Sequence, residues 1–447
     1  MKITLIEPTA PENRRSVGSW FVERAARSAG YDVRYVTTPE PSDVELVSLH
    51  HQSDYFNLAQ MPRLAKIRII GGHPMASNPE PVRHLGDVVC CGEGESWITE
   101  ALNHISRTRS VDGLRAAGTL LPEMSDCTVR AETVVPEHPP FLNIASSAGH
   151  DDTWYIELSR GCASKCHYCD LGWSGYARHR AKDSVVRALD NIDRARTNKV
   201  SLFAPDEADH PDYPFIIDEI RRRKLVTQFG SLRVDSLRAS GLSVPRSFLM
   251  RFGIDGLTEE SRRRVGKPIS NAEIYEMFRY AADIEHTNIK LFMIIGYPWE
   301  VPADFEEFDD LMQRCAAIPR RQNAHVRIKW TPLIPQPNTP LGAAEVQYPA
   351  WMAGVVSAWH ARNRHPARSP GLYIVQDGKV MNRVNHAAQC ALAQGGEDVR
   401  PYLTRPIGEI ADAWLRGRIR KAARCTTVLR PNGTPINIER IQRRHAT

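Results

Sequence analysis

Long apolar stretches are missing from this chain of 447 residues. No window approaches the roughly 18 consecutive apolar residues of a membrane-spanning helix, so a helical membrane protein is excluded. The first apolar run, within MKITLIEPTAPENRR, is too short for a secretory signal peptide, so we expect a cytoplasmic protein. Low-complexity tracts and short-period repeats are absent too, and 42% hydrophobic and 25% charged residues exclude a mostly disordered chain.

Cysteine is scarce, with 9 residues in the whole chain. An odd number this small does not suit the disulfide framework of a secreted scaffold. Three of the nine nevertheless crowd into one short run, SRGCASKCHYCDLGW, as Cys162, Cys166 and Cys169. In a reducing compartment such crowding indicates metal or redox chemistry.

The excess of positive charge is small, at +6, and it is concentrated at the C-terminal end. From Pro401 onward, ten basic residues against three acidic ones give this tail a charge of +7. A basic face attracts phosphate backbones, which favours a nucleic-acid partner. The alternative is a solvated amphipathic helix, IGEIADAWLRGRIRKAARC, whose charges face water.

Short apolar runs alternate with helical patterns over residues 1–110. Strands are expected at Lys2–Glu7, Asp32–Thr37, Asp43–Leu49, Ile67–Gly71 and Asp87–Cys91, and helices at Ser19–Ala29 and Glu95–Ile105. This α/β alternation predicts a doubly wound parallel sheet, which binds ligands outside the carboxyl ends of its strands. Two glycine-bearing loops, Gly71–Pro81 and Gly92–Glu95, follow such ends; ordinary tight turns are the alternative.

The alternation resumes over residues 151–345, after a linker at 111–150 that is rich in Pro, Ser, Thr and Asp. Strands are expected at Trp154–Arg160, Lys199–Phe203, near Gln228–Arg233, Leu249–Ile254, Ile289–Ile295 and Ala324–Trp330, and helices at Ser184–Ala195, Pro214–Arg223, Asn271–Glu285 and Glu306–Ile318. Repeated βα units predict a partial β/α barrel, with its chemistry at the carboxyl ends of the strands.

Residues 346–447 are expected to form a helical, basic C-terminal extension that recognises the substrate. A helix is predicted at Trp351–Arg364, and a β-hairpin at Gly371–Val384 that turns at Asp377–Gly378. Cys390 and Cys425 are isolated in this region. Either could serve an auxiliary cluster or carry a methyl group, but buried packing is the plainer interpretation.

The cysteine run has the form C-x3-C-x2-C and directly follows a predicted strand. Three thiolates on one loop can hold a small polynuclear site, and iron–sulfur clusters take up to four. With three, one iron would stay open to a ligand that is not part of the protein. A structural zinc ion is the alternative, but it would want a fourth Cys or His, and His167 is awkwardly placed inside the loop.

This run, with the aromatic Tyr168 before its third cysteine, resembles the signature of the radical S-adenosylmethionine (radical SAM) superfamily. The resemblance covers roughly residues 1–345 and includes GSLRVDSL, GKPIS, IKLFMIIGYP and WTPLIPQPNTPLG. The segments GGHP and CGEGE are similar to those of a branch that carries an N-terminal cobalamin-binding-type domain.

The resemblance implies a specific chemistry. Cys162, Cys166 and Cys169 would bind three irons of a 4Fe–4S cluster, and S-adenosylmethionine would chelate the fourth. One electron, from a flavodoxin-type or ferredoxin-type partner, would cleave the sulfonium C–S bond. The resulting 5′-deoxyadenosyl radical would abstract hydrogen from the substrate, with the cofactor carrying the difficult chemistry.

The resemblance also implies further cofactor contacts besides Tyr168. Asp206 and Glu207, in APDEADH, would bind the amino group of S-adenosylmethionine, although this segment departs from a Gly-Gly-Glu pattern. Arg233 and Asp235 would reach its carboxylate or ribose; a structural salt bridge is the alternative. The segment that would lie against adenine is Ile295, Gly296 and Tyr297, where a plain strand-end turn is the alternative.

Whether the first domain binds cobalamin stays open. Relatives that use this cofactor hold it on loops after the first, third and fourth strands, which here are EPTAPENRR, HHQSDYF and GGHPMASNPEP. No Asp-x-His-x-x-Gly run supplies an axial histidine, although this branch often lacks one. His50, His51 and His73 lie on these loops, but isolated loop histidines are more often surface residues. An empty domain is the alternative, and a bound cobalamin would indicate methyl transfer.

Three functions remain. The first is a radical enzyme that modifies a nucleic-acid base in tRNA or DNA, for example by isomerisation or alkyl rearrangement, with the basic tail holding phosphates. The second is cobalamin-dependent radical methylation of a small metabolite or natural-product precursor. The third is a non-enzymatic binding module stabilised by a metal. Radical methylthiolation is disfavoured because the N-terminal domain has no second cluster of three cysteines.

Overall fold

The first domain is built on a six-stranded sheet. The computed structural model describes residues 1–8, 15–143, 152–228, 232–240, 249–345, 348, 350–366, 369–423, 426–430, 432–437, 440 and 442. The strand order is β2-β1-β3-β4-β5-β6, in which the first five strands are parallel and β6 is antiparallel. These strands are β1 (Ile3–Ile6), β2 (Val33–Val36), β3 (Ser42–Leu49), β4 (Ala65–Gly72), β5 (Val88–Cys90) and β6 (Thr119–Leu120).

Helices cover both faces of this sheet, which explains why six of the eight residues of its central strand β3 are buried. Its own helices are α1 (Val17–Ser28), α2 (Asp54–Gln60), α3 (His73–Ser77) and α4 (Glu95–Thr108). α1 and α4 pack against each other and share one core with the sheet. The other face is shared with two helices from the far end of the chain, α12 (Arg383–Gln394) and α13 (Ile407–Leu415).

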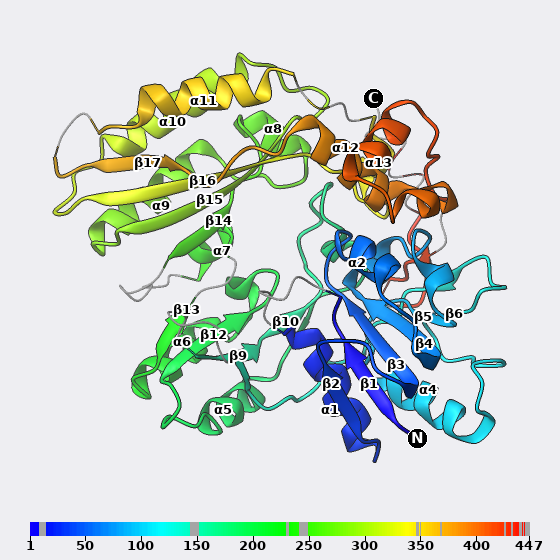
Figure 1. Ribbon diagram of the computed structural model, residues 1–447. Coiled ribbons are helices and arrows are strands. Elements are labelled where there is room, and N and C mark those ends of the chain that lie inside the picture. The colour runs from blue at the N-terminus through cyan, green and yellow to red at the C-terminus, as the bar shows by residue number, and fades with distance from the viewer. Residues whose placement is uncertain are drawn as a thin grey trace.

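The C-terminal extension thus completes the first domain. Ala391 and Ile410 are fully buried in the same core as Ile70 of β4. The side-chain amide of Asn78 donates hydrogen bonds to the carbonyls of Ala393 (3.1 Å) and Gly395 (2.9 Å). Figure 1 shows α12 and α13 beside α2.

The second domain is a partial barrel made of two four-stranded sheets. One has the order β13-β12-β9-β8 and the other β14-β15-β16-β17, and an isolated parallel bridge between Leu232 and Phe252 links them. All neighbouring strands are parallel except β8 and β9. The strands are β8 (Phe141–Asn143), β9 (Thr153–Glu157), β12 (Lys199–Phe203), β13 (Val226–Gln228), β14 (Met250–Gly253), β15 (Asn288–Ile295), β16 (Ala324–Pro332) and β17 (Leu372–Gln376).

Helices lie on the outside of these sheets, as Figure 1 shows for α10 and α11. They are α5 (Lys182–Asp190), α6 (Tyr213–Arg222), α7 (Val234–Ala239), α8 (Glu259–Arg264), α9 (Asn271–Asp283), α10 (Asp304–Ala316) and α11 (Met352–Asn363). Two small pairs complete the fold, β10 (Ser159–Arg160) with β11 (Arg178–His179), and β7 (Cys127–Thr128) with β18 (Thr426–Thr427). The predicted fold class, a doubly wound domain, a partial β/α barrel and a helical C-terminal extension, is confirmed.

The predicted hairpin at Gly371–Val384 is wrong. The strand β17 pairs with β16 in parallel, from Ala324↔Leu372 to Ile328↔Gln376, and the chain enters α12 soon after Gly378. A parallel neighbour needs a crossover connection, which α11 supplies. The barrel sheet therefore continues to residue 376.

The basic helix at residues 407–425 is shorter than expected. α13 ends at Leu415, and Gly417 follows with a φ of 67°, the left-handed conformation that commonly ends a helix. Arg418 and Arg420 therefore lie beyond the helix. Cys425 falls outside the described residues.

Two barrel elements also differ from their predicted bounds. β13 ends at Gln228, so Arg233 is not in a strand but directly precedes α7; residues 229–231 lie outside the described part. α5 ends at Asp190 rather than at residue 195. No helix in the described part of the chain is long and apolar enough to cross a membrane.

Candidate active site

The loop that carries the three cysteines is held from several sides. His167 donates its backbone N–H to the carbonyl of Val265 (2.8 Å) and accepts the N–H of Leu341 (2.9 Å). The indole N–H of Trp173 donates to the carbonyl of Cys166 (2.9 Å). At Gly266, where φ is +71°, an added Cβ would lie 2.9 Å from His167 Nε2, so glycine permits this close packing. The loop is therefore fixed against the carboxyl-end loops of the barrel.

The thiols of this loop suit an iron–sulfur cluster. Cys166 is buried, and Cys162 and Cys169 are half-buried. Burial raises the pKa of Cys162, and burial together with Asp170 raises the pKa of Cys169 to about 12, so metal binding would have to displace these protons. In the described residues no three His, Cys, Asp or Glu side chains converge on the position of a single metal ion. Three thiols spread over one loop, without a fourth ligand, fit a cluster with one open iron better than a tetrahedral zinc site.

The remaining described cysteines are packing residues. Each is buried away from the cysteine loop: Cys90, Cys91, Cys127, Cys315 and Cys390. The Cys390 thiol lies 3.7 Å from His386 Nε2 within α12. Burial raises the pKa of Cys390 to about 12, so this thiol is protonated at neutral pH.

Tyr168 connects the cysteine loop to the ends of two barrel strands. Its hydroxyl donates to Asp255 Oδ2 (2.8 Å), which also accepts from Lys267 Nζ (2.7 Å). The Tyr297 hydroxyl donates to the backbone carbonyl of Asp255 (3.2 Å). Burial, and then the charge of Asp255, raise the pKa of Tyr168 well above its usual value. Asp255 follows β14, and the sequence did not single it out.

Three of the predicted cofactor ligands meet beside the cysteines. The Arg233 guanidinium donates two hydrogen bonds to Asp235, at 3.0 and 2.7 Å, and its Nη1 lies 3.5 Å from Cys166 Sγ. Asp206 accepts from the Ser236 hydroxyl (2.5 Å) and from the backbone N–H of Arg233 (3.3 Å). Burial raises the pKa of Asp206. Asp206, Arg233 and Asp235 therefore lie together beside the cysteine loop, and their role as ligands of S-adenosylmethionine stays a prediction.

The side chains of Glu207 and Ile295 are not open to a cofactor. Both side chains are fully buried, and Ile295 belongs to the barrel core, so only backbone at this strand end can meet a ligand. The backbone N–H groups of Gly296 and Tyr297 donate to one carboxylate oxygen of Glu300, at 2.6 and 3.2 Å. Burial raises the pKa of Glu300 to about 7.

Glu300 is a positioning residue that the sequence interpretation missed. Besides the two backbone groups, its carboxylate accepts from the Ser261 hydroxyl (3.0 Å). The Tyr297 ring stacks on Trp299 with centroids 5.3 Å apart. The sequence did contain a signal, because an acidic residue ends the otherwise apolar segment MIIGYPWE. A carboxylate buried there needs several hydrogen-bond donors.

Buried ion pairs lock the first domain onto the barrel. Arg160 of β10 contacts Glu95 (2.5 Å), Glu157 (2.8 Å) and Glu93 (3.3 Å). Arg178 of β11 contacts Glu93 through both carboxylate oxygens, at 2.5 and 3.0 Å. Burial raises the pKa of Glu157. The carboxylates of the predicted ligand loop Gly92–Glu95 are therefore engaged in holding the two domains together.

A mostly apolar cavity of about 670 Å³ lies at this junction. One wall is formed by the strand-end loops Gly71–His73 and Gly92–Glu95 of the first domain, and the other includes Arg160, Gly161 and Leu171 of the barrel. The size is typical of ligand and cofactor pockets, roughly 300–1,000 Å³. The cavity therefore lies where the sequence placed a cofactor on the first domain, next to the cysteine loop.

The three histidines considered as axial ligands each use a ring nitrogen within the protein. His50 Nε2 lies 3.2 Å from Glu7, and His51 Nδ1 lies 3.1 Å from the Ser53 hydroxyl. His73 Nε2 lies 3.3 Å from Asp170, whose hydrogen bond raises the pKa of His73. The cavity thus fits a large ligand held by apolar walls and backbone rather than by a dedicated imidazole. Most of the first candidate loop, residues 9–14, lies outside the described part.

Comparisons with known proteins agree with this geometry. Residues 156–312 match the sequence profile of the radical SAM superfamily. An uncharacterized protein of Methanocaldococcus jannaschii is 22% identical over 398 residues, which cover 87% of this chain and 83% of the relative.

Solved structures share this fold over most of the chain. The cobalamin-dependent S-adenosylmethionine radical enzyme OxsB with aqua-cobalamin bound matches 71% of this chain and 53% of its own at 13% identity, with a TM-score of 0.54. Its complex with aqua-cobalamin and S-adenosylmethionine matches 71% and 52% at 13% identity, with a TM-score of 0.53. The chain spans about half the length of OxsB, so this likeness concerns the fold. With the family profile lying over the cysteine loop and the barrel strands around it, residues 156–312 form a domain of the radical SAM superfamily.

Proposed function

We propose that this radical SAM enzyme binds cobalamin in the cavity between its two domains. The observation that carries the proposal is the cavity itself, because it is mostly apolar, lies on the strand-end loops and opens beside the cysteine loop. The fold shared with OxsB, whose structure contains aqua-cobalamin, supports the same placement. Bound cobalamin would supply a carrier for a methyl group beside the radical site.

The residues of the barrel hold the other cofactors. Cys162, Cys166 and Cys169 would bind the cluster, and Asp206 and Arg233, which lie beside Cys166, would receive the amino-acid end of S-adenosylmethionine. When bound, these cofactors would supply radical chemistry driven by one electron, for which a flavodoxin-type or ferredoxin-type protein would be the donor.

The backbone of Gly296 and Tyr297 would hold the adenine of S-adenosylmethionine. Glu300 holds both N–H groups, so the strand end is preorganised before the cofactor arrives. The Tyr168–Asp255 hydrogen bond positions the cysteine loop against the same edge of the barrel.

A nucleic-acid base remains our proposed substrate, but the C-terminal tail supports it less than its composition suggested. Arg416 pairs with Asp412 at 2.7 Å, and Arg420 pairs with Asp398 at 2.9 Å, so part of the charge is locally balanced. Exposed pairs of this kind reduce the net field over the tail.

Anaerobic reconstitution tests the radical chemistry. With iron, sulfide, S-adenosylmethionine and a reductant, wild-type protein should release 5′-deoxyadenosine, and Cys162→Ala should lose both the cluster absorbance and the release. Cys315→Ala is the matched control, because this thiol is buried in α10 away from the loop, and it should retain both. Release by Cys162→Ala at the wild-type rate would contradict the assignment of the cluster.

Filling the cavity tests the cobalamin site. Gly71 lines it, and an added Cβ there meets only Cys90 Cβ, at 3.7 Å, so Gly71→Leu should place its side chain in the cavity without backbone strain. We expect a loss of cobalamin binding, measured by absorbance titration, with the cluster retained. Gly354→Leu, on the exposed face of α11, is the control. Wild-type protein that binds no cobalamin would contradict this site and leave the radical chemistry untouched.

A further inference from the structure

The sheet β14–β17 has one apolar face and one cationic face. Side chains on its outer face, such as Leu291 and Ile328, are buried between the sheet and the helices α9, α10 and α11. The alternate positions point to the inside of the partial barrel: Arg251, Gly253, Asn288, Lys290, Phe292, Ile294, His325, Arg327, Lys329, Thr331, Tyr373 and Val375. None of these inner positions is acidic. Barrel interiors are commonly filled by branched apolar residues, so this inner face is adapted to something other than packing.

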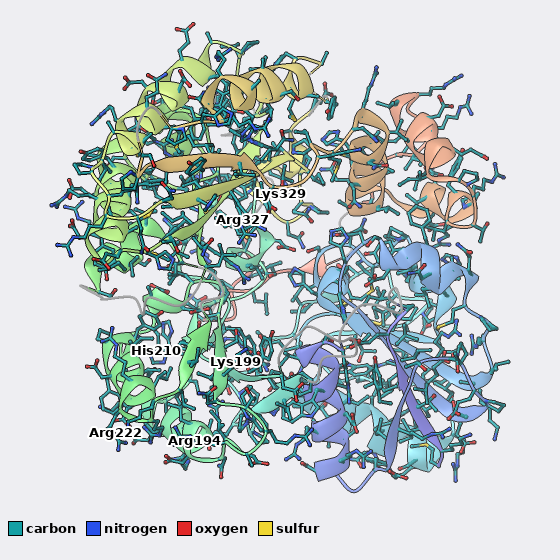
Figure 2. All side chains as sticks on the ribbon, turned by 60° about the vertical axis from the view of Figure 1, so that its left-hand side comes forward. Arg194, Lys199, His210, Arg222, Arg327 and Lys329 are labelled. Atoms are coloured by element: carbon teal, nitrogen blue, oxygen red, sulfur yellow. The ribbon has the colours of Figure 1, made fainter. Side chains whose placement is uncertain are left out.

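Three cations stand side by side across neighbouring strands. The register pairs Arg251 with Lys290 and Lys290 with Arg327, which places them in one row at a strand spacing of about 4.8 Å. Like charges directly opposite one another destabilise a sheet. Lys329 adds a fourth cation in the next row, opposite Phe292. Figure 2 labels Arg327 and Lys329 on β16.

One carboxylate partly balances this row. Asp377, just after β17, accepts a contact from Lys290 Nζ at 2.5 Å. That hydrogen bond, with the charges of Arg327 and Lys329, lowers the pKa of Asp377. Four cations against this single carboxylate leave these inner positions with a positive charge, and a surface of one sign of charge raises the local concentration of anions.

Aromatic rings lie among the cations. Phe292 is 38% exposed, unusual for a large apolar side chain inside a barrel, and Lys290 Nζ lies 5.0 Å from its ring centroid. Tyr373 stacks with His325, with centroids 5.3 Å apart. Alternating cations and exposed rings are typical of surfaces that bind single-stranded nucleic acid, where phosphates meet the cations and bases stack on the rings.

This face leads directly to the cysteine loop. Phe292 pairs with Gly253, and an added Cβ at Gly253 would lie 2.7 Å from Asp255 Oδ2. Asp255 in turn accepts the hydrogen bond of Tyr168, which lies between two of the cluster cysteines. Phe292 on the inner face is therefore connected to the cysteine loop through Gly253, Asp255 and Tyr168.

We propose that the inner face of β14–β17 binds a single-stranded segment of nucleic acid and directs one base toward the cluster. The cation row and Lys329 would hold the phosphates, and Phe292 would stack a base. This inference gives the proposed nucleic-acid substrate a binding surface and rests on the proposed radical function for its chemistry. Binding itself can be measured without turnover, so the two proposals can fail separately.

The test measures oligonucleotide binding with the reconstituted full-length protein. A fluorescent single-stranded oligonucleotide is titrated by anisotropy at several salt concentrations, against Lys290→Gln/Arg327→Gln/Lys329→Gln. We expect the triple variant to bind about tenfold or more weakly at low salt, and its salt slope to fall by about 2, because each phosphate contact contributes about 0.7. The control removes three exposed cations outside the barrel, Arg279→Gln/Arg314→Gln/Arg321→Gln, and should bind like wild type.

A second variant tests the stacking. Phe292→Leu keeps the side chain apolar but removes the ring, and we expect about tenfold weaker binding with an unchanged salt slope. Cluster absorbance and release of 5′-deoxyadenosine without substrate, measured on every variant, report folding. Equal binding by the inner-face triple variant and wild type, a larger loss in the outer control, or equally tight binding of a mononucleotide would each overturn the proposal. Normal 5′-deoxyadenosine release in those cases would leave the radical function standing.

Discussion

The two faces of the sheet β14–β17 come from the same residues of sequence and have opposite chemistry. Along β15 the outward Ile289, Leu291 and Met293 are fully or almost fully buried, whereas Lys290 and Phe292 between them face the interior of the barrel and are partly exposed. The outer face exists because helices must be packed on it. The inner face carries residues that packing does not require, and one row of like charges that packing alone would disfavour. The contrast separates what stabilises this barrel from what it can use to bind a substrate.

The largest expected loss of stability comes from a substitution on the outer face of the sheet. Trp330 of β16 is 2% exposed, contacts the rings of Phe305, Phe308 and Trp359, and donates its indole N–H to His360 (2.8 Å). Trp330→Ala should lower the free energy of unfolding by about 3–5 kcal/mol, because it removes this contact area and leaves a cavity. The midpoint of urea-induced unfolding measures the change.

The neighbouring inner-face residue is the control for this effect. Lys329→Ala should change the free energy of unfolding by no more than about 0.5 kcal/mol, since its side chain makes no comparable packing contribution. Equal losses of unfolding free energy in Trp330→Ala and Lys329→Ala would show that the two faces contribute equally to stability.

A pH effect of intermediate size is expected where the sheet ends. Burial raises the pKa of Glu300 to about 7 from a usual value near 4.5. The folded protein therefore holds this proton more tightly than the unfolded chain, and the stability it contributes is present below pH 4.5 and is lost as the pH rises toward 7. The difference in unfolding free energy between Glu300→Gln and wild type should shift by about 2.5 kcal/mol in favour of the variant from pH 5 to pH 8.

Urea denaturation of both proteins at the two pH values measures this shift. Ser240→Ala, a change of a half-buried residue without a titratable group at the C-cap of α7, gives the baseline for unrelated pH effects. A difference between Glu300→Gln and wild type that does not vary with pH would show that the carboxylate is ionised throughout this range.

The smallest expected change in stability comes from a substitution on the inner face. Arg327→Gln relieves the repulsion within the cation row while leaving the Lys290–Asp377 pair in place. Without ligand, we expect the unfolding free energy to rise by about 0.2–1 kcal/mol at low ionic strength. The gain should shrink at high salt, where such interactions are screened. Thermal unfolding at two salt concentrations measures it, and a loss of stability would mean that Arg327 supports the fold.

The alternation of strands and helices was sufficient to predict both domains, since buried parallel strands carry apolar runs that survive in the sequence. The predicted hairpin at Gly371–Val384 was wrong because an alternating pattern does not reveal with which strand a segment pairs. The packing of α12 on the first domain was also beyond prediction, because an apolar helical face does not name its partner.

The candidate site, too, was predicted from the sequence only in part. The spacing of Cys162, Cys166 and Cys169 was enough to expect a cluster, because ligands close in sequence are close in space. Asp255, Lys267 and Glu300 come from separate loops, and nothing local marks them as neighbours of Tyr168 or Gly296.

The sequence by itself determined the chemistry of this protein, because three thiols on one short loop and the strand–helix alternation are local properties of the chain. Only the tertiary structure decided where that chemistry can act. It brought the domains together around a cavity through Arg160 and Glu95, and its strand register placed Arg251, Lys290 and Arg327 in one row. Register depends on hydrogen bonds between strands that are distant in sequence, so a row of charges across a sheet emerges only when the sheet forms.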